Sequence, residues 1–274
     1  MKTLFATLAV VIAAAAALTA TAATPPSANS IAALGDSITR AFDTCSVAYT
    51  DCPANSWSTG TNTSVNSWYL RLLGTNAGIR GHNYNDAKTG AKMADLNGQA
   101  QTAVAQGANV ITILMGANDV CTSSVSSMTP AATLGTQLQT ALNTIKSGDP
   151  SAQVYVMSIP NVYHLWEILH TNLGANLVWG IAGICQSLLA NPRSTSAADQ
   201  ARRAQVQQQT IADNTTIAQV CGQVQFASQC HYDNGAAYNV AFTTSDVTTR
   251  DYFHPTVSGQ AKAAAATWSA FFGS

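Results

Sequence analysis

The chain has 274 residues, a net charge of −1 and only 9% charged residues. The low charge and the lack of a basic stripe argue against a nucleic-acid partner, and they give no electrostatic reason to dock on an anionic membrane. The length suits one α/β domain that can bury a full core.

The N-terminus has the pattern of a signal peptide. Lys2 precedes an apolar run at 4–18, and the small residues ATA at 20–22 follow it. The run is shorter than the ~20 residues that a membrane span needs, so an uncleaved anchor is the less favoured alternative. No second apolar stretch of spanning length follows. We therefore expect a signal peptide over 1–22, a single domain over 23–274, and secretion.

Short apolar runs predict buried strands, and apolar residues at helical spacing predict helices. Strands alternating with helices indicate a parallel sheet with right-handed crossovers. We expect a three-layer α/β/α sandwich, flavodoxin-like, with about five mostly parallel strands. In chain order we predict a strand at 31–34, a disulfide-stapled loop at 43–66, helices at 65–73 and 94–108, a strand at 109–115, a helix at 130–145, a strand at 154–159, a helix at 200–220, a short strand at 224–226 and a helix at 257–271.

The stretch 162–191 carries more apolar residues than one crossover helix needs. One interpretation is that these residues are ordinary buried core. The other is that they form an apolar cap beside an active site.

Six cysteines lie beyond the N-terminal signal-peptide pattern, and an even number after a signal peptide indicates disulfides. Six cysteines allow 15 pairings. We favour nearest-neighbour pairs because two of them close short local loops. Zinc is the competing explanation, but the sequence has no CxxC pair and no HExxH helix. The expected pairs are Cys45–Cys52, Cys121–Cys185 and Cys221–Cys230.

Ligands of open parallel sheets bind beyond the carboxyl ends of the strands. GDSI at 35–38 follows the first predicted strand, and GAND at 116–119 follows the strand at 109–115. DYFHP at 251–255 precedes the last helix. These three segments can meet at one edge of the sheet.

A serine hydroxyl is a weak nucleophile until a base removes its proton, and the base is usually a histidine held by a carboxylate. Ser37 lies where a strand is expected to turn into a helix, which would expose its oxygen. Asp251 lies three residues before His254, so one turn can bring its carboxylate to the imidazole. Pro255 restricts the backbone there.

These blocks and Gly90, within NDAKTGA at 85–91, resemble those of the SGNH (GDSL-type) hydrolases and occur in that family's order. The resemblance extends from Ile31 to Trp268, and four blocks are far more specific than GDS alone. Within the family, the chain is most similar to the phospholipase-B-like branch. The motifs that support this branch are SWSTG at 56–60, GANDVC at 116–121, IPN at 159–161 with Trp166 beyond, and DYFHPTVSGQAKAA at 251–264.

The resemblance implies a role for each matching residue. Ser37 would be the nucleophile, His254 the general base and then acid, and Asp251 the residue that orients His254. The oxyanion donors would be the N–H groups of Ser37 and Gly90 and the side-chain amide of Asn118. The α/β-hydrolase elbow GxSxG is absent around Ser37, which disfavours that other serine-hydrolase fold.

Other polar residues have simpler interpretations. Asp36 is expected to cap the helix predicted after it, and Asp119 to accept a structural hydrogen bond. His164, His170 and His231 lack the spacing of metal ligands, so we expect no metal.

The predicted function is that of a secreted, monomeric serine esterase or lipase without a cofactor. The apolar stretch 162–191 and the resemblance favour acyl lipids or other apolar esters as substrates. A deacetylase of decorated polysaccharide is the alternative, because the family includes such enzymes and small acyl groups need only a small pocket. A secreted binding module without turnover is a third possibility, against which the intact set of site residues argues.

Overall fold

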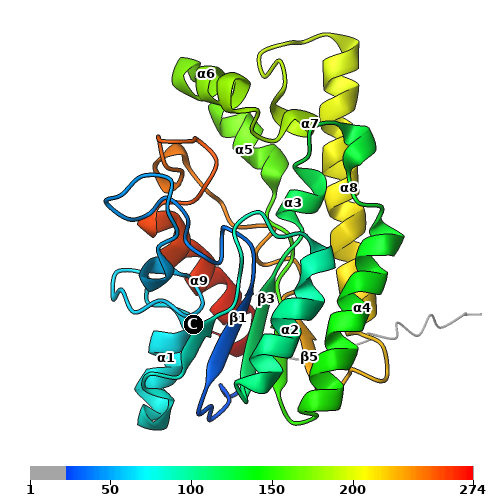
Figure 1. Ribbon diagram of the computed structural model, residues 1–274. Coiled ribbons are helices and arrows are strands. Elements are labelled where there is room, and N and C mark those ends of the chain that lie inside the picture. Colours follow the sequence, from blue (N-terminus) through cyan, green and yellow to red (C-terminus); the bar gives the residue numbers. More distant parts are fainter. Residues whose placement is uncertain (1–22, 274) are drawn as a thin grey trace, which may run out of the picture.

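The computed structural model describes residues 23–273 and has a five-stranded parallel sheet between two layers of helices (Figure 1). The strand order is β2-β1-β3-β4-β5, which is the flavodoxin-like order. The predicted three-layer α/β/α fold is therefore confirmed. The strands are β1 (Ile31–Gly35), β2 (Asn83–Asn85), β3 (Val110–Leu114), β4 (Gln153–Val156) and β5 (Cys230–Tyr232).

The neighbouring strands β1 and β3 end at the same height in the sheet. Gly35 at the end of β1 pairs with Leu114 at the end of β3. A side chain at Gly35 could not be accommodated, since its Cβ would lie 2.4 Å from the carbonyl oxygen of Leu114. Because the two strands end together, the residues that follow them emerge side by side.

Helices α2 (Leu96–Ala105), α4 (Ala131–Gly148) and α8 (Ala197–Cys221) cover one face of the sheet. Their buried apolar residues pack against strand residues such as Ile111 and Ile113, and both of these strand residues are 1% exposed. A strand buried on both faces reads as a continuous apolar run, which is why β1 and β3 are visible in the sequence.

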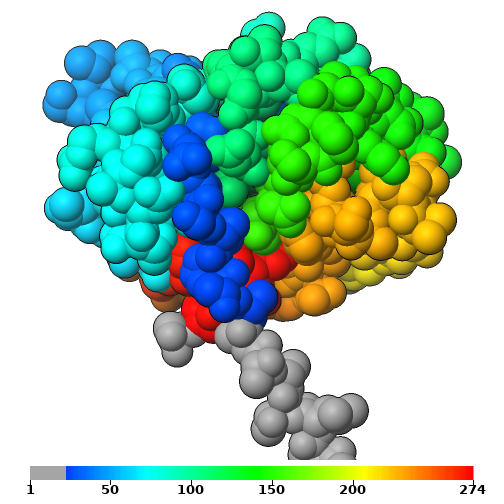
Figure 2. Space-filling view, turned by 90° about the horizontal axis from the view of Figure 1, so that it is seen from below, coloured from blue at the N-terminus to red at the C-terminus, as the bar shows by residue number. Residues whose placement is uncertain are grey.

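Helices α1 (Trp68–Thr75) and α9 (Val257–Phe272) cover the other face. Its core is aromatic, with Trp68 packed edge-on against Trp268 at a centroid distance of 5.3 Å. Figure 2 views the molecule from below the orientation of Figure 1. It shows the first described residues, in blue, beside the C-terminal helix, in red.

Helices α3 (Ala117–Val120), α5 (Val162–Leu169), α6 (Leu173–Ala182) and α7 (Gln186–Leu189) lie beyond the carboxyl ends of the strands (Figure 1). The stretch 162–191 forms a third apolar cluster with residues of α3 and α8 rather than joining either core of the sheet. It is therefore a cap with a small core of its own. Short 3-10 turns complete the elements at Pro53–Asn55, Ala77–Ile79, Met93–Asp95, Val125–Ser127 and Thr244–Asp246.

Three local predictions are wrong. Residues 224–226 form no strand; the fifth strand is Cys230–Tyr232, and Phe226 is a buried residue in the turn before it. The edge strand β2 was not expected, because Asn83–Asn85 is polar. No helix follows β1: residues 36–43 are turns, with Ala41 and Asp43 at positive φ.

The structure contains all three nearest-neighbour disulfides, Cys45–Cys52, Cys121–Cys185 and Cys221–Cys230. Within residues 23–273, no helix combines the length and the apolar character that crossing a bilayer requires. The predicted signal peptide, 1–22, lies outside the described residues.

Candidate active site

Two segments far apart in the chain meet at the carboxyl edge of the sheet. Ser37 lies in the turn after β1, which is held by hydrogen bonds from the N–H groups of Arg40 and Phe42 to the carbonyls of Asp36 and Ser37. His254 lies in the loop before α9. That loop is closed by a hydrogen bond from the N–H of Thr248 to the His254 carbonyl.

Ser37, His254 and Asp251 form one continuous chain of hydrogen bonds. The Ser37 hydroxyl lies 2.8 Å from His254 Nε2, and His254 Nδ1 lies 2.5 Å from Asp251 Oδ2. An ionised carboxylate only accepts, so Nδ1 carries the ring proton and Nε2 is left as an acceptor for the hydroxyl. This tautomer can receive the proton of Ser37.

The surroundings of the three side chains favour a charged Asp251 beside a positioned imidazole. Burial would raise the pKa of the Asp251 carboxyl, but hydrogen bonds from the His254 ring and from the N–H groups of His254 and Phe253 outweigh it and lower that pKa. The His254 ring packs against Phe42 and Phe253, at centroid distances of 4.8 and 5.1 Å.

The structure also brings the expected oxyanion donors to this edge. The Asn118 side-chain amide donates to the carbonyl of Ala91 at 2.9 Å, which leaves its second N–H for another partner. The loop that carries Gly90 is bonded to the end of β1, through the N–H of Lys88 and the carbonyl of Gly35. Gly90 has φ of +81°, a conformation that favours glycine.

The two neighbouring aspartates have structural partners. Asp36 is fully buried and accepts from the N–H of Ile38 at 2.9 Å, so it stabilises the turn around Ser37 rather than capping a helix. Burial raises the pKa of Asp36 to about 6. Asp119 accepts from the N–H of Met93 at 2.9 Å, a structural hydrogen bond as expected.

Comparison with known proteins identifies the family of this chain. The model of the GDSL-like lipase/acylhydrolase family matches residues 33–262. The chain belongs to this family. No curated protein matches the sequence at a significant level.

Solved structures of a phospholipase and of a carbohydrate esterase share the fold of this chain. A phospholipase A1 from Streptomyces albidoflavus is similar, with 16% identity, a TM-score of 0.53 and coverage of 89% of this chain and 99% of that one. A family 3 carbohydrate esterase from Talaromyces cellulolyticus has 16% identity, a TM-score of 0.51 and coverage of 86% and 93%. An extracellular lipase from Streptomyces rimosus has 19% identity, a TM-score of 0.49 and coverage of 88% and 99%.

Two buried glutamines of this GDSL hydrolase support the segment around Ser37, and sequence reasoning missed both. Gln99 in α2 accepts from the N–H of Gly35 at 2.7 Å and donates to its carbonyl at 2.9 Å. Gln260 in α9 donates to the carbonyl of Ile38 at 2.8 Å. The backbone on both sides of Ser37 is therefore held by hydrogen bonds from the two helical layers, one on each face of the sheet. The only feature of the sequence that could have indicated them is that each glutamine interrupts the apolar face of its helix.

The cap supports the histidine segment. Trp179 of α6 is fully buried, and its indole N–H donates to the carbonyl of Tyr252 at 3.0 Å. Tyr252 lies between Asp251 and His254 and has φ of +54°, an uncommon conformation for a residue with a side chain. The hydrogen bond from Trp179 therefore holds a strained position within the candidate site.

The other histidines do not join the site. His164 bonds to Glu167 and to the carbonyl of Phe242, His170 stacks on Trp166, and His231 is in β5. Across the part of the chain that the structure describes, no three His, Cys, Asp or Glu side chains are grouped as ligands for a metal ion.

The disulfide between Cys121 and Cys185 ties the short helix that carries Asn118 to the cap. We predict that replacing both cysteines by serine costs roughly 2–5 kcal/mol of unfolding free energy and, by loosening Asn118, lowers kcat by up to about a hundredfold. Urea unfolding and ester hydrolysis by the folded variant measure the two effects.

The matched control is the same change at Cys221 and Cys230, which join the end of α8 to the amino end of β5, away from the site. That variant should lose stability and keep its turnover. Unchanged kcat in the Cys121/Cys185 variant would contradict a link between the cap and the candidate oxyanion site.

Proposed function

We propose that this protein is a serine carboxylic-ester hydrolase that works through an acyl-enzyme on Ser37. The observation that carries the proposal is the continuous hydrogen-bond chain from the Ser37 hydroxyl through His254 to Asp251, with distances of 2.8 and 2.5 Å. Membership of the GDSL-like lipase/acylhydrolase family supports it.

In the first half of the reaction, Ser37 Oγ attacks the ester carbonyl while His254 Nε2 takes the hydroxyl proton. The resulting imidazolium is stabilised by the carboxylate of Asp251. The N–H groups of Ser37 and Gly90 and the free amide N–H of Asn118 would hold the negative oxygen of the tetrahedral intermediate. His254 then gives its proton to the leaving alcohol.

In the second half, water attacks the acyl group on Ser37. His254 takes a proton from this water, a second tetrahedral intermediate forms, and the proton returns to Ser37 as the acid leaves. Every proton in this cycle moves through the same ring nitrogen, so the tautomer set by Asp251 matters in both halves.

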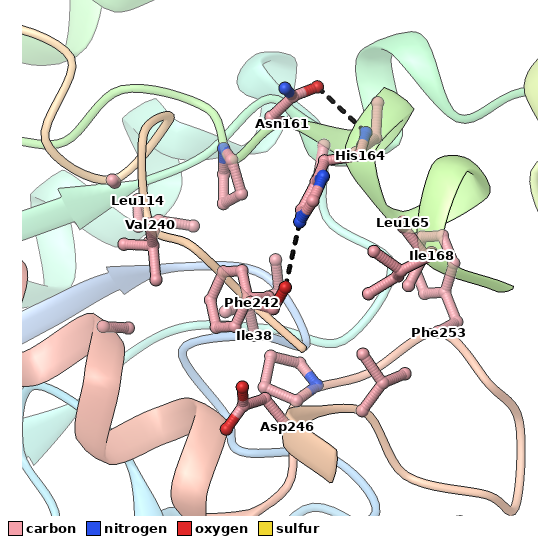
Figure 3. A pocket seen from close by; sticks show the side chains of 17 residues that line it. Ile38, Leu114, Asn161, His164, Leu165, Ile168, Val240, Phe242, Asp246 and Phe253 are labelled. Carbon is pink, nitrogen blue, oxygen red and sulfur yellow. Dashed lines mark hydrogen bonds between the residues drawn. The ribbon is translucent and has the colours of Figure 1, made fainter. Parts of the chain in front are cut away.

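An apolar pocket adjoins the candidate site and supports an acyl group as the part of the substrate that is recognised (Figure 3). Ile38, Ala117 and Phe253 line it, and each is the sequence neighbour of a candidate catalytic or oxyanion residue. Leu165 and Ile168 of α5 contribute to the wall from the cap. The pocket therefore lies between the catalytic edge of the sheet and the cap.

The few polar side chains of this pocket already have partners within the protein. His164 bonds across the wall to the carbonyl of Phe242 at 2.9 Å, as Figure 3 shows, and Asn161 accepts from the His164 N–H at 3.1 Å. Asp246 is paired with Lys262. Because these groups are satisfied, the pocket offers a ligand mainly apolar contacts, which suits an acyl chain.

The structural neighbours include both a phospholipase A1 and a carbohydrate esterase, so the fold does not separate a lipid ester from an acetylated sugar. The apolar pocket favours acyl lipids or other apolar esters over the polysaccharide deacetylase considered above.

We predict that kcat/KM on p-nitrophenyl esters rises from acetate through butyrate to hexanoate. Each methylene buried in the pocket contributes about 0.8 kcal/mol, or roughly a fourfold gain for each carbon while the chain still fits. Initial rates across the ester series, with phosphatidylcholine run in parallel, measure the effect.

Ile168→Trp, which fills the pocket, should remove the preference for longer chains, whereas Ile211→Trp at an exposed site on α8 should leave it intact. Activity confined to the acetate ester would contradict the proposal that the substrates are acyl lipids or other apolar esters, and it would favour the deacetylase.

We further propose that the protein is secreted as a single domain over 23–274, after loss of residues 1–22. Three disulfides suit an oxidising compartment, in agreement with the N-terminal pattern. N-terminal sequencing of exported protein tests this, because an intact Met1 would contradict it.

A further inference from the structure

Exposed apolar side chains are concentrated around the candidate site. Of the seven large hydrophobic side chains that are strongly exposed in residues 23–273, five lie on just two segments. One segment is the loop closed by Cys45–Cys52 and the other is α6. The five are Val47, Tyr49, Leu173, Leu177 and Ile181.

Three of the five form a stripe along α6, which we call the α6 stripe: Leu173, Leu177 and Ile181. Their spacing of four residues puts them on one face of the helix, and they are 70%, 63% and 80% exposed. The opposite face carries Ala175 and Trp179, both fully buried in the cap. The stripe is thus not needed for packing.

Both apolar segments are attached to the loop that carries His254. Trp179 of α6 donates to the carbonyl of Tyr252 at 3.0 Å. From the other side, the Tyr49 hydroxyl donates to the carbonyl of Arg250 at 3.3 Å, and the Arg250 guanidinium donates to the carbonyl of Cys45 at 2.8 Å. Figure 1 shows α6 beyond the same edge of the sheet as these loops. The exposed apolar groups therefore flank the catalytic loop.

The same surface has little net charge. Residues 171–192, which include all of α6, contain no charged side chain. In the 43–52 loop the two acids are both paired, Asp43 with Arg250 and Asp51 with Arg40. A surface of this kind has no electrostatic preference for anionic lipids, and its contribution to binding is apolar.

The size of the patch argues against a second copy of the chain as its partner. A stable protein interface buries about 800 Å² on each side, over some 20 residues, far more than three leucine-sized side chains and a nearby valine provide. A lipid surface needs no matching partner shape and takes up single apolar side chains.

We propose that the α6 stripe, with Val47, docks this enzyme on a zwitterionic phospholipid surface and so brings the catalytic loop to its ester substrate. This inference rests on the proposed ester hydrolase function, which it extends from the site to its approach to the substrate. Docking through α6 would place the pocket between the cap and the sheet beside the lipid.

The test is flotation with phosphatidylcholine vesicles, done in a Ser37→Ala background so that binding is measured without hydrolysis. Changing Leu173, Leu177 and Ile181 to serine should lower the partition coefficient at least tenfold, because each side chain would otherwise be taken out of water. The control changes Ile211 and Val224, which are 49% and 91% exposed but lie on α8 and beyond its end, and should bind as before.

With Ser37 intact, the triple variant should still hydrolyse dissolved p-nitrophenyl butyrate and should lose activity only on vesicles. Unchanged vesicle binding by the triple variant would overturn the docking proposal, and so would a dimer in sedimentation that the triple variant converts to monomer. Vesicle binding without ester hydrolysis by the wild type would instead contradict the proposed function.

Discussion

Replacing Ser37 by alanine is expected to lower kcat for ester hydrolysis by roughly a millionfold, the scale seen when a triad serine is removed from a hydrolase. The variant has no oxygen to form the acyl-enzyme, so only slow attack by water remains, assisted by the oxyanion donors. The hydroxyl has a single side-chain partner, His254, and its loss leaves the turn after β1 intact. The measurement is kcat on p-nitrophenyl butyrate, with thermal unfolding as the check on the fold.

Ser158→Ala is the matched control. Ser158 also follows a strand at this edge and its hydroxyl is also buried, but it donates to Asp233 at 3.0 Å and has no contact with His254. We expect it to affect stability and not turnover. A fluorophosphonate probe should label the wild type and not Ser37→Ala. A wild type that neither reacts with the probe nor hydrolyses any ester would leave the binding module as the remaining interpretation.

The position of Ser37 could be predicted because its cause is local. A buried apolar strand followed by Gly-Asp-Ser marks the carboxyl end of β1, and parallel topology brings the end of β3 beside it. The same reasoning located Asn118. The sequence also indicated how Asp251 reaches His254, since three residues of turn can span the distance.

The elements that were missed lack such a local cause. β2 is a polar edge strand of three residues, and β5 reads Cys-His-Tyr, so neither shows an apolar run. Phe226 misled the prediction because a buried aromatic residue was taken as strand, whereas it fills the core from a turn. An apolar residue indicates that its side chain is buried, but it does not by itself indicate whether its backbone is strand, helix or turn.

The support around the site was invisible for a different reason. Gln99, Trp179 and Gln260 act through hydrogen bonds to backbone atoms 64, 73 and 222 residues away in the chain. No spacing rule connects residues so distant. The sequence could therefore indicate the candidate catalytic side chains, but only the fold reveals which side chains hold them in position.

Replacing Asp251 by asparagine is the second large effect that we expect, a fall in kcat of about ten-thousandfold. The amide keeps an oxygen for the N–H groups of Phe253 and His254, but its NH₂ group can donate to His254 Nδ1. The ring proton would then move to Nε2, which faces Ser37 and could no longer accept its proton. The variant should fold, bind substrate with a similar KM and turn over very slowly.

Asp246→Asn separates this effect from the loss of any buried carboxylate near the loop. Asp246 is 1% exposed and lies five residues from Asp251, but it pairs with Lys262 and has no bond to His254. It should lower the melting temperature and leave most of kcat, and any effect on substrate binding through the pocket that it lines would appear in KM. If Asp251→Asn instead kept kcat within about tenfold of the wild type, the carboxylate would not set the tautomer of His254, and Ser37 and His254 would have to act as a dyad. The 2.5 Å contact between Asp251 and His254 argues for the triad.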